Sequence, residues 1–236
     1  ALKCTALSKG DAQSLHFTSG KNSVLLDVSQ GIVRSWNVRN KELINSFGIP
    51  IFWKPAVSES ARYRVTKQDV TPDGMIVTME RLFTSKNDAA LEHLLVRHTV
   101  EVSRDLEKLT IKTALIDGHN SETGGGGFTL GFRYQCFPSN IGFGGKIRMI
   151  SGGKEYIYSR NMKRNVFAVG MTDSAKIMKK LFACVDDPVL IDRSRAILEY
   201  GNALKVRLTA YPEKQFAGYA VWDTPNLKHP TFEPFF

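Results

Sequence analysis

The strongest constraint on the fold of this chain is a hydrophobic pattern with a period of two residues. From Leu94 to Val102 every second residue is apolar or histidine, and the residues between them are mostly polar. Successive side chains of a β-strand point to opposite faces, so this alternation predicts a strand with one buried face. A second alternating run, 109–115, follows a polar turn. The two runs together predict a long antiparallel hairpin.

The same alternation recurs along the chain, whereas helical periodicity is scarce. Clear strands are predicted over Met75–Phe83 and Leu204–Ala210. A short helix is predicted over Ala175–Phe182, and one helical turn over Asn87–Leu91. Because parallel βαβ alternation is absent, we expect an all-β fold, a large antiparallel β-sandwich with one or two short helices. This length permits a single sandwich domain over residues 1–236. Weaker strands are predicted at Ser23–Val28, Gly31–Val38, Phe128–Tyr134, Lys146–Ile150, Glu155–Ser159, Ala196–Tyr200 and Ala217–Trp222.

The charge of the chain is basic but dispersed. The 236 residues include 32 Lys and Arg against 23 Asp and Glu, a formal net charge of +9. The densest basic runs, 160–164 and 176–180, are not embedded in a known nucleic-acid-binding motif. This argues against nucleic acid as the main partner. Arg and Lys in a cleft would instead favour an acidic or phosphorylated ligand.

Several other classes of protein are disfavoured by the sequence. No segment approaches the roughly 18 consecutive apolar residues that a membrane-spanning helix needs, so no transmembrane segment is expected. The five histidines lack the spacing of a metal site, and no phosphate-binding or dinucleotide-binding motif is present, so neither a metal nor a cofactor is expected. The first residue is Ala1, which favours an exported protein, with a cytoplasmic location as the alternative. No feature specifies an oligomeric state.

Aromatic residues with polar neighbours point to a sugar ligand. A flat aromatic ring complements the C–H face of a sugar, and nearby carboxylates and arginines bind its hydroxyl groups. The alternative is structural, because such aromatics often pack in the core and such arginines often pair with acids inside a sandwich. The predicted substrate-binding residues are Trp53, Arg81, Arg133, Tyr134 and Trp222.

Four segments, in order along most of the chain, resemble the galactose-mutarotase (aldose 1-epimerase) superfamily. The resemblance implies a galactose-mutarotase-like β-supersandwich, and a sugar or oligosaccharide as the partner. The segments are Gly31–Val38 with the following Lys41–Ile44, then Gly48–Pro55, the hairpin His93–Leu115, and Tyr219–Asn226.

The resemblance also implies candidate catalytic residues. In that family a glutamate on a late strand is the general base toward the anomeric hydroxyl, and a mid-chain histidine is the general acid toward the ring oxygen. Asp223 stands at the position of the base, and Glu233 is a second candidate for this role. The segment that matches the family's acid, Phe132–Phe137, contains Arg133 but no histidine. His98 or His119 is the alternative source of an acid.

Three functional hypotheses follow from these residues. The first is an aldose 1-epimerase-like isomerase that opens and recloses a sugar ring by acid–base catalysis. The second is a non-catalytic carbohydrate-binding protein on the same scaffold. The third is a basic interaction module whose partner is an acidic polymer or protein.

Overall fold

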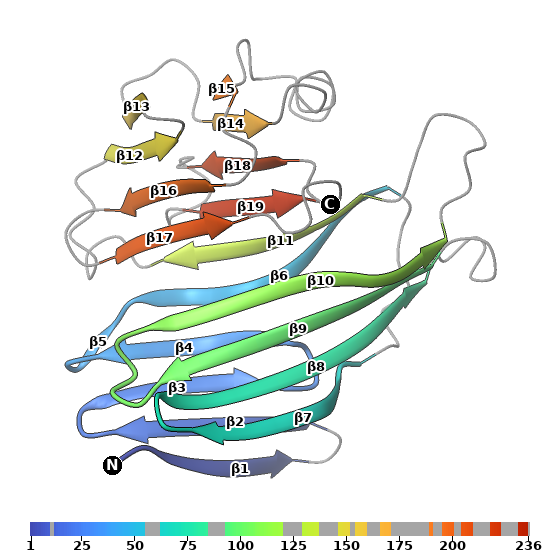
Figure 1. The fold of residues 1–236 in the computed structure, drawn as a ribbon, viewed down its shortest axis with the longest axis vertical. Helices are drawn as coiled ribbons and strands as arrows, with labels where there is room; N and C mark the ends of the chain where they lie inside the picture. Colours follow the sequence, from blue (N-terminus) through green and yellow to red (C-terminus); the bar gives the residue numbers. More distant parts are fainter. Residues whose placement is uncertain are drawn as a thin grey trace. The chain divides into compact units, whose positions relative to one another are not determined.

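The protein is nearly all β-structure (Figure 1). Strands are the only regular elements among the described residues, which confirms the predicted antiparallel all-β class. None of these residues forms a helix that could cross a bilayer. The two predicted helical segments, 87–91 and 175–182, lie outside the described residues. The computed structural model describes residues 1–9, 12–54, 62–84, 93–119, 129–136, 146–151, 154–159, 166–170, 189–190, 195–200, 204–209, 218–222 and 231–235.

The chain divides into two compact units. Unit 1 is Ala1–Thr129 and unit 2 is Leu130–Phe236. The single domain over residues 1–236 stays a prediction.

Unit 1 begins with a series of antiparallel strands that we call sheet I. Neighbours along the chain pair in the order β1-β2-β3-β4-β6, and β5 pairs with β4. These strands are β1 (Lys3–Lys9), β2 (Ala12–Ser19), β3 (Asn22–Asp27), β4 (Ile32–Val38), β5 (Lys41–Glu42) and β6 (Ile44–Lys54).

The other strands of unit 1 form a four-stranded antiparallel sheet, here sheet II, in the order β10-β9-β8-β7. The predicted hairpin is confirmed, because Leu109 of β10 pairs with Val102 of β9 in an antiparallel register. The predicted strand Met75–Phe83 lies within β8. The bounds are β7 (Arg64–Thr71), β8 (Gly74–Thr84), β9 (His93–Ser103) and β10 (Leu109–His119).

The core of unit 1 is built from the inward faces of these strands. Along β8 and β9 nearly every second residue is buried, as the alternation predicts. Burial of each large apolar side chain contributes about 1.5–3 kcal/mol. Enclosed side chains come from both sheets, among them Phe17, Val24, Leu26 and Val33 of sheet I and Val77, Met79, Phe83 and Val96 of sheet II.

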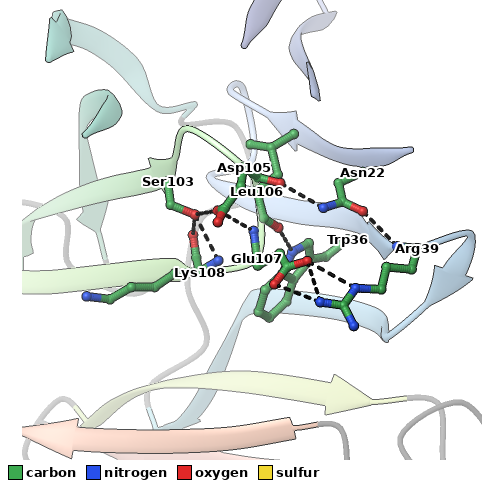
Figure 2. A network of polar contacts seen from close by, with 8 residues as sticks. All are labelled: Asn22, Trp36, Arg39, Ser103, Asp105, Leu106, Glu107 and Lys108. Carbon is green, nitrogen blue, oxygen red and sulfur yellow. Dashed lines mark hydrogen bonds and ion pairs between the residues drawn. The ribbon is translucent and has the colours of Figure 1, made fainter. Parts of the chain in front are cut away.

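A polar network joins the β9–β10 turn to sheet I (Figure 2). The indole Nε1 of Trp36, on β4, donates a hydrogen bond to the carbonyl oxygen of Leu106 at 2.8 Å. Leu106 is fully buried and has a φ of 60°, a conformation that non-glycine residues rarely adopt. The turn therefore places the side chain of Leu106 in the core, while the carbonyl oxygen of Leu106 accepts the hydrogen bond from Trp36 of the other sheet.

Side chains at the rim complete this network (Figure 2). Asn22 donates from Nδ2 to the carbonyl oxygen of Asp105 at 2.8 Å, and its Oδ1 accepts from the backbone N–H of Arg39 at 2.7 Å. The guanidinium of Arg39 pairs with Glu107 at 2.9 Å. Exposed ion pairs contribute about 0–1 kcal/mol each, so the buried Trp36 hydrogen bond is the stronger tie.

Unit 2 contains two sets of strands. The first, sheet III, has the order β11-β19-β18-β14-β15, and the second, sheet IV, is antiparallel with the order β13-β12-β16-β17. Sheet III consists of β11 (Thr129–Cys136), β14 (Val166–Gly170), β15 (Val189–Leu190), β18 (Gly218–Trp222) and β19 (Thr231–Phe235). Sheet IV consists of β12 (Lys146–Ser151), β13 (Lys154–Ser159), β16 (Arg195–Tyr200) and β17 (Leu204–Thr209).

Candidate functional site

Three of the predicted site residues come from neighbouring strands of sheet III. Arg133 lies on β11, Glu233 on β19 and Trp222 on β18, and β19 is the strand between the other two. The chain therefore brings together positions that are far apart in sequence. β11 and β19 are separated by about 100 residues.

The register of these strands places the three residues on one face. Residues that are opposite each other in paired strands share a face of the sheet, and so do residues two apart along a strand. Ala220 of β18 is opposite Glu233. Trp222 is opposite Thr231, which is two residues before Glu233 and therefore on the same face. Gln135 of β11 is likewise opposite Thr231. Because the strands are antiparallel, Arg133, two residues before Gln135, is opposite Glu233 on the neighbouring strand. We call this surface the Arg133–Glu233–Trp222 face.

The residue types on this face suit a sugar. An indole offers a flat apolar surface to C–H groups, a carboxylate accepts hydrogen bonds from hydroxyl groups, and a guanidinium donates to hydroxyl, carboxylate or phosphate oxygens. Asp223, the other candidate base, directly follows Trp222 in the sequence and lies outside the described residues.

The remaining predicted residues lie elsewhere. Tyr134 is opposite Phe232, so it belongs to the other face of sheet III, where its side chain is only 6% exposed. This burial fits the alternative of core packing for Tyr134. Trp53 lies in β6 and Arg81 in β8, both in unit 1.

Arg81 lies on the inward face of β8, where the neighbouring positions Met79 and Phe83 are apolar. The residue is only 5% exposed. Its Cζ atom is 4.3 Å from the ring centroid of Phe83 and 5.8 Å from that of Tyr63, within the range of cation–π attraction. Burial lowers the pKa of Arg81, and the charge of Arg62 acts in the same direction. The guanidinium nevertheless stays charged, because arginine does not lose its proton in proteins.

His98 lies beside Arg81 on the inward face of sheet II and is fully enclosed. The ring of Tyr63 stacks on the imidazole at 4.9 Å between centroids, and the Tyr63 hydroxyl is 3.4 Å from Nε2. Burial lowers the pKa of His98 to about 3; a hydrogen bond with the Gly31 backbone opposes this, and the charge of Arg81 adds to it. The imidazole is therefore neutral near pH 7.

Gly31 makes this stacking possible. Its φ is +67°, and a Cβ atom there would lie 2.6 Å from Cε2 of Tyr63. The backbone N–H of Tyr63 also donates to the carbonyl oxygen of Ser29 at 2.9 Å. The sequence carries no signal for Tyr63, because the residue precedes β7 and belongs to no alternating run. The inward orientation of His98 could be predicted from the alternation.

The burial of His98 shows whether this residue can replace the acid histidine of the mutarotase family. A general acid needs a pKa near the operating pH and a path to its substrate. His98 has neither, so it is not a substitute for the family's acid histidine. His119 ends β10. Among the residues that the structure describes, no group of three or more His, Cys, Asp or Glu is placed to hold a metal ion.

Two solved structures share the fold of this chain. One is YeaD from Salmonella typhimurium, provisionally designated a mutarotase. It matches with a TM-score of 0.54 and 9% identity, over 98% of this chain and 85% of its own. The other, HI1317, matches with a TM-score of 0.52 and 8% identity, over 99% of this chain and 92% of its own. The chain therefore has a mutarotase-like fold, as its sequence motifs predicted. No family model and no curated protein sequence matches it.

Proposed function

We propose that this protein binds an aldose on the Arg133–Glu233–Trp222 face. The observation that carries the proposal is the register of sheet III, because it gathers an aromatic residue, a carboxylate and a guanidinium on one face of three adjacent strands. The mutarotase-like fold supports it. The basic charge of the chain and Arg133 itself favour an acidic or phosphorylated sugar over a neutral one.

A second proposal is that the bound sugar undergoes anomer exchange, as in an aldose 1-epimerase. This reaction needs one group that accepts a proton from the anomeric hydroxyl and another that donates a proton to the ring oxygen. Glu233 or Asp223 would be the base. Because His98 is enclosed and neutral, the acid has to be another group. Sugar binding is therefore the primary proposal, and the fold likeness is the observation that favours catalysis.

Calorimetry tests the binding proposal. Glucose, galactose and their 6-phosphates are titrated into the protein, and we expect the phosphorylated forms to bind more tightly. Trp222→Ala should weaken binding at least tenfold, or about 1.4 kcal/mol. Tyr134→Phe is the matched control, because Tyr134 is an aromatic residue of the same sheet on the opposite face. Equal losses in the two variants, or no binding by the wild type, would contradict the proposal.

Saturation-transfer NMR on the same sugars tests anomer exchange. Exchange above the spontaneous rate is expected if the protein is an epimerase, and Glu233→Gln or Asp223→Asn should remove it. Unchanged rates in both variants would rule out these residues as the base. Binding without acceleration would identify a carbohydrate-binding protein. Retention on heparin that falls with salt, without any sugar binding, would favour the third hypothesis, a basic interaction module.

A further inference from the structure

The net charge of the chain is concentrated in unit 2. Residues 1–129 hold 16 Lys and Arg against 14 Asp and Glu, whereas residues 130–236 hold 16 against 9. Unit 1 is thus +2 and unit 2 is +7. A charge difference between two halves of a chain points to an anionic partner of the basic half.

Sheet IV presents part of this excess on one face. Its register aligns Arg148 with Ile157 on one side and with Glu199 on the other, and aligns Glu199 with Lys205. Alternation then assigns the remaining residues of the four strands to this face or to the opposite one. The cations on the Arg148 face are Lys146, Arg148, Arg195, Lys205 and Arg207, and the carboxylates are Glu155 and Glu199.

The two carboxylates of this face are both engaged by Arg148. Its guanidinium contacts Glu155 at 2.9 Å through one nitrogen and Glu199 at 2.9 Å through another, and Lys205 lies 3.3 Å from Glu199. Hydrogen bonds from Arg148 lower the pKa of both glutamates. The face keeps a net charge of +3 at neutral pH. It is open to solvent, since the side chains of Arg148 and Lys205 are 45% and 60% exposed.

We propose that this face of sheet IV binds the surface of a bilayer that contains anionic lipids. The inference is independent of the proposed sugar site, which lies on sheet III. It rests on how the cations are distributed and on the residue types between them.

The distribution fits an array of anions in two dimensions. The five cations lie on three of the four strands, in four successive rows of residues across the sheet. With the usual strand spacing and rise, they cover a surface of about 10 Å by about 20 Å. A linear polyanion would contact only one line of these cations, whereas lipid headgroups present negative charge across the whole surface.

The residue types argue against the other occupants. Bases and sugars stack on aromatic rings, and the centres of protein interfaces are enriched in Tyr, Trp and Phe. In the described strands of sheet IV, the tyrosines alternate to the opposite face, where Tyr156 is opposite Met149 and both Tyr158 and Tyr200 are opposite Ile147. The cationic face holds isoleucines instead, at positions 150, 157 and 197. A cluster of Lys and Arg is attracted to the negative surface of a bilayer that contains anionic lipids.

Vesicle cosedimentation tests this proposal with the full chain. We expect binding to vesicles of phosphatidylcholine and phosphatidylglycerol in equal parts, and none to phosphatidylcholine alone. Binding should weaken as salt rises from about 0.01 M to about 0.15 M, because the Debye length falls from about 30 Å to about 8 Å. Each basic residue near such a surface is worth about 1 kcal/mol, or about fivefold in affinity. Lys146→Gln with Arg207→Gln should therefore reduce binding about 25-fold.

The matched control removes the same charge from sheet II. Arg97→Gln with Lys112→Gln also changes the net charge by two, on a face where each of these cations has a carboxylate partner. This control should lose less than about twofold, because its lost cations are already neutralised. Equal losses in the two double variants would overturn the proposal, since net charge alone would then explain binding. Retention on heparin without vesicle binding would also overturn it. If the first variant does not fold in a thermal melt, Lys146→Gln with Arg195→Gln replaces it.

Discussion

Sheets II and IV are both four-stranded antiparallel sheets with one apolar and one polar face, but their charges are arranged differently. Sheet II has four cations and four carboxylates on its polar face, and Arg97 pairs with Glu80 while Lys67 pairs with Asp69. Its remaining cation, Arg81, is buried on the other face. Sheet IV has five cations and two carboxylates on its polar face.

This difference suggests that the charges of sheet II affect the stability of the protein, whereas those of sheet IV affect its binding to partners. A buried charge is costly unless its surroundings compensate for it, so substitutions around Arg81 should change the free energy of unfolding. Exposed ion pairs contribute little to stability, but unmatched surface cations set the affinity for anionic partners. We therefore expect substitutions near sheet II to alter stability and substitutions on sheet IV to alter binding.

The largest effect is expected for Gly31→Ala. The new Cβ atom would overlap the ring of Tyr63, and a non-glycine residue at this φ costs about 1–2 kcal/mol in addition to about 1–3 kcal/mol for overpacking. Urea unfolding should show a loss of about 2–5 kcal/mol, with vesicle binding unchanged at temperatures where the variant is folded. Gly20→Ala is the control, because Gly20 has a similar φ of +59° and a Cβ atom there would meet no other atom within 4 Å. Equal losses in the two variants would mean that Tyr63 can move aside.

The buried histidine predicts a dependence of stability on pH. The unfolded chain takes up a proton at His98 near pH 6.5, whereas the folded protein does so only near pH 3. The unfolded state therefore binds more protons in this window, and stability is lost as the pH falls through it. Between pH 6.5 and pH 4.5 the loss should be about 2–3 kcal/mol. His98→Phe should flatten the curve. A curve that keeps its slope in His98→Phe would assign the effect to another group.

A smaller loss is expected for Trp36→Phe. This substitution removes the hydrogen-bond donor to the carbonyl oxygen of Leu106, a fully buried residue. An unsatisfied buried acceptor costs about 1–2 kcal/mol, measured by chemical denaturation. A change in the position of the β9–β10 turn, seen as faster amide exchange at Glu107 and Lys108, should accompany it. No loss of stability would show that solvent replaces the indole at this carbonyl.

The smallest effect on stability, and a clear effect on binding, is expected for Arg148→Gln. Arg148 is exposed, so its pairs with Glu155 and Glu199 contribute little to folding and the melting temperature should not change measurably. The variant removes the ion pair of Glu155 with Arg148 and leaves Glu199 paired with Lys205, so the face loses one positive charge. Affinity for anionic vesicles should fall at least fivefold in cosedimentation. A large drop in melting temperature with unchanged vesicle binding would reverse the comparison of the two sheets.

Much of unit 1 could be predicted from the sequence. Alternation alone located β8, β9 and β10, and it placed His98 on the buried face, because side-chain direction follows directly from strand geometry. Arg81, which was selected as a sugar-binding residue, is buried on the same face. It did not reveal β1 or β7, whose residues are mostly exposed and therefore show no apolar period. The role of Tyr63 could not be predicted either, since it depends on a contact with Gly31 from another sheet.

The candidate site was predictable as a set of residue types but not as an arrangement. Trp222, Arg133 and Glu233 were selected for their chemistry and for a family resemblance. Only the register of β11, β19 and β18 shows that they share a face, and that Tyr134 does not. The pairing register of strands that are so distant in sequence produces no pattern in the local sequence from which it could be predicted. His98 is a further case, because its enclosure, and not its sequence position, excludes it as an acid.

The position of β19 has a consequence for how the protein forms during synthesis. Unit 1 is assembled mainly from hairpins of consecutive strands, which close short loops at low entropic cost and fold quickly. Sheet III is different, because β19 is synthesised after both β11 and β18 and yet lies between them in the sheet. On the ribosome, unit 1 can therefore acquire its structure while the Arg133–Glu233–Trp222 face is still incomplete. The proposed ligand-binding face therefore cannot form until β19 has been synthesised.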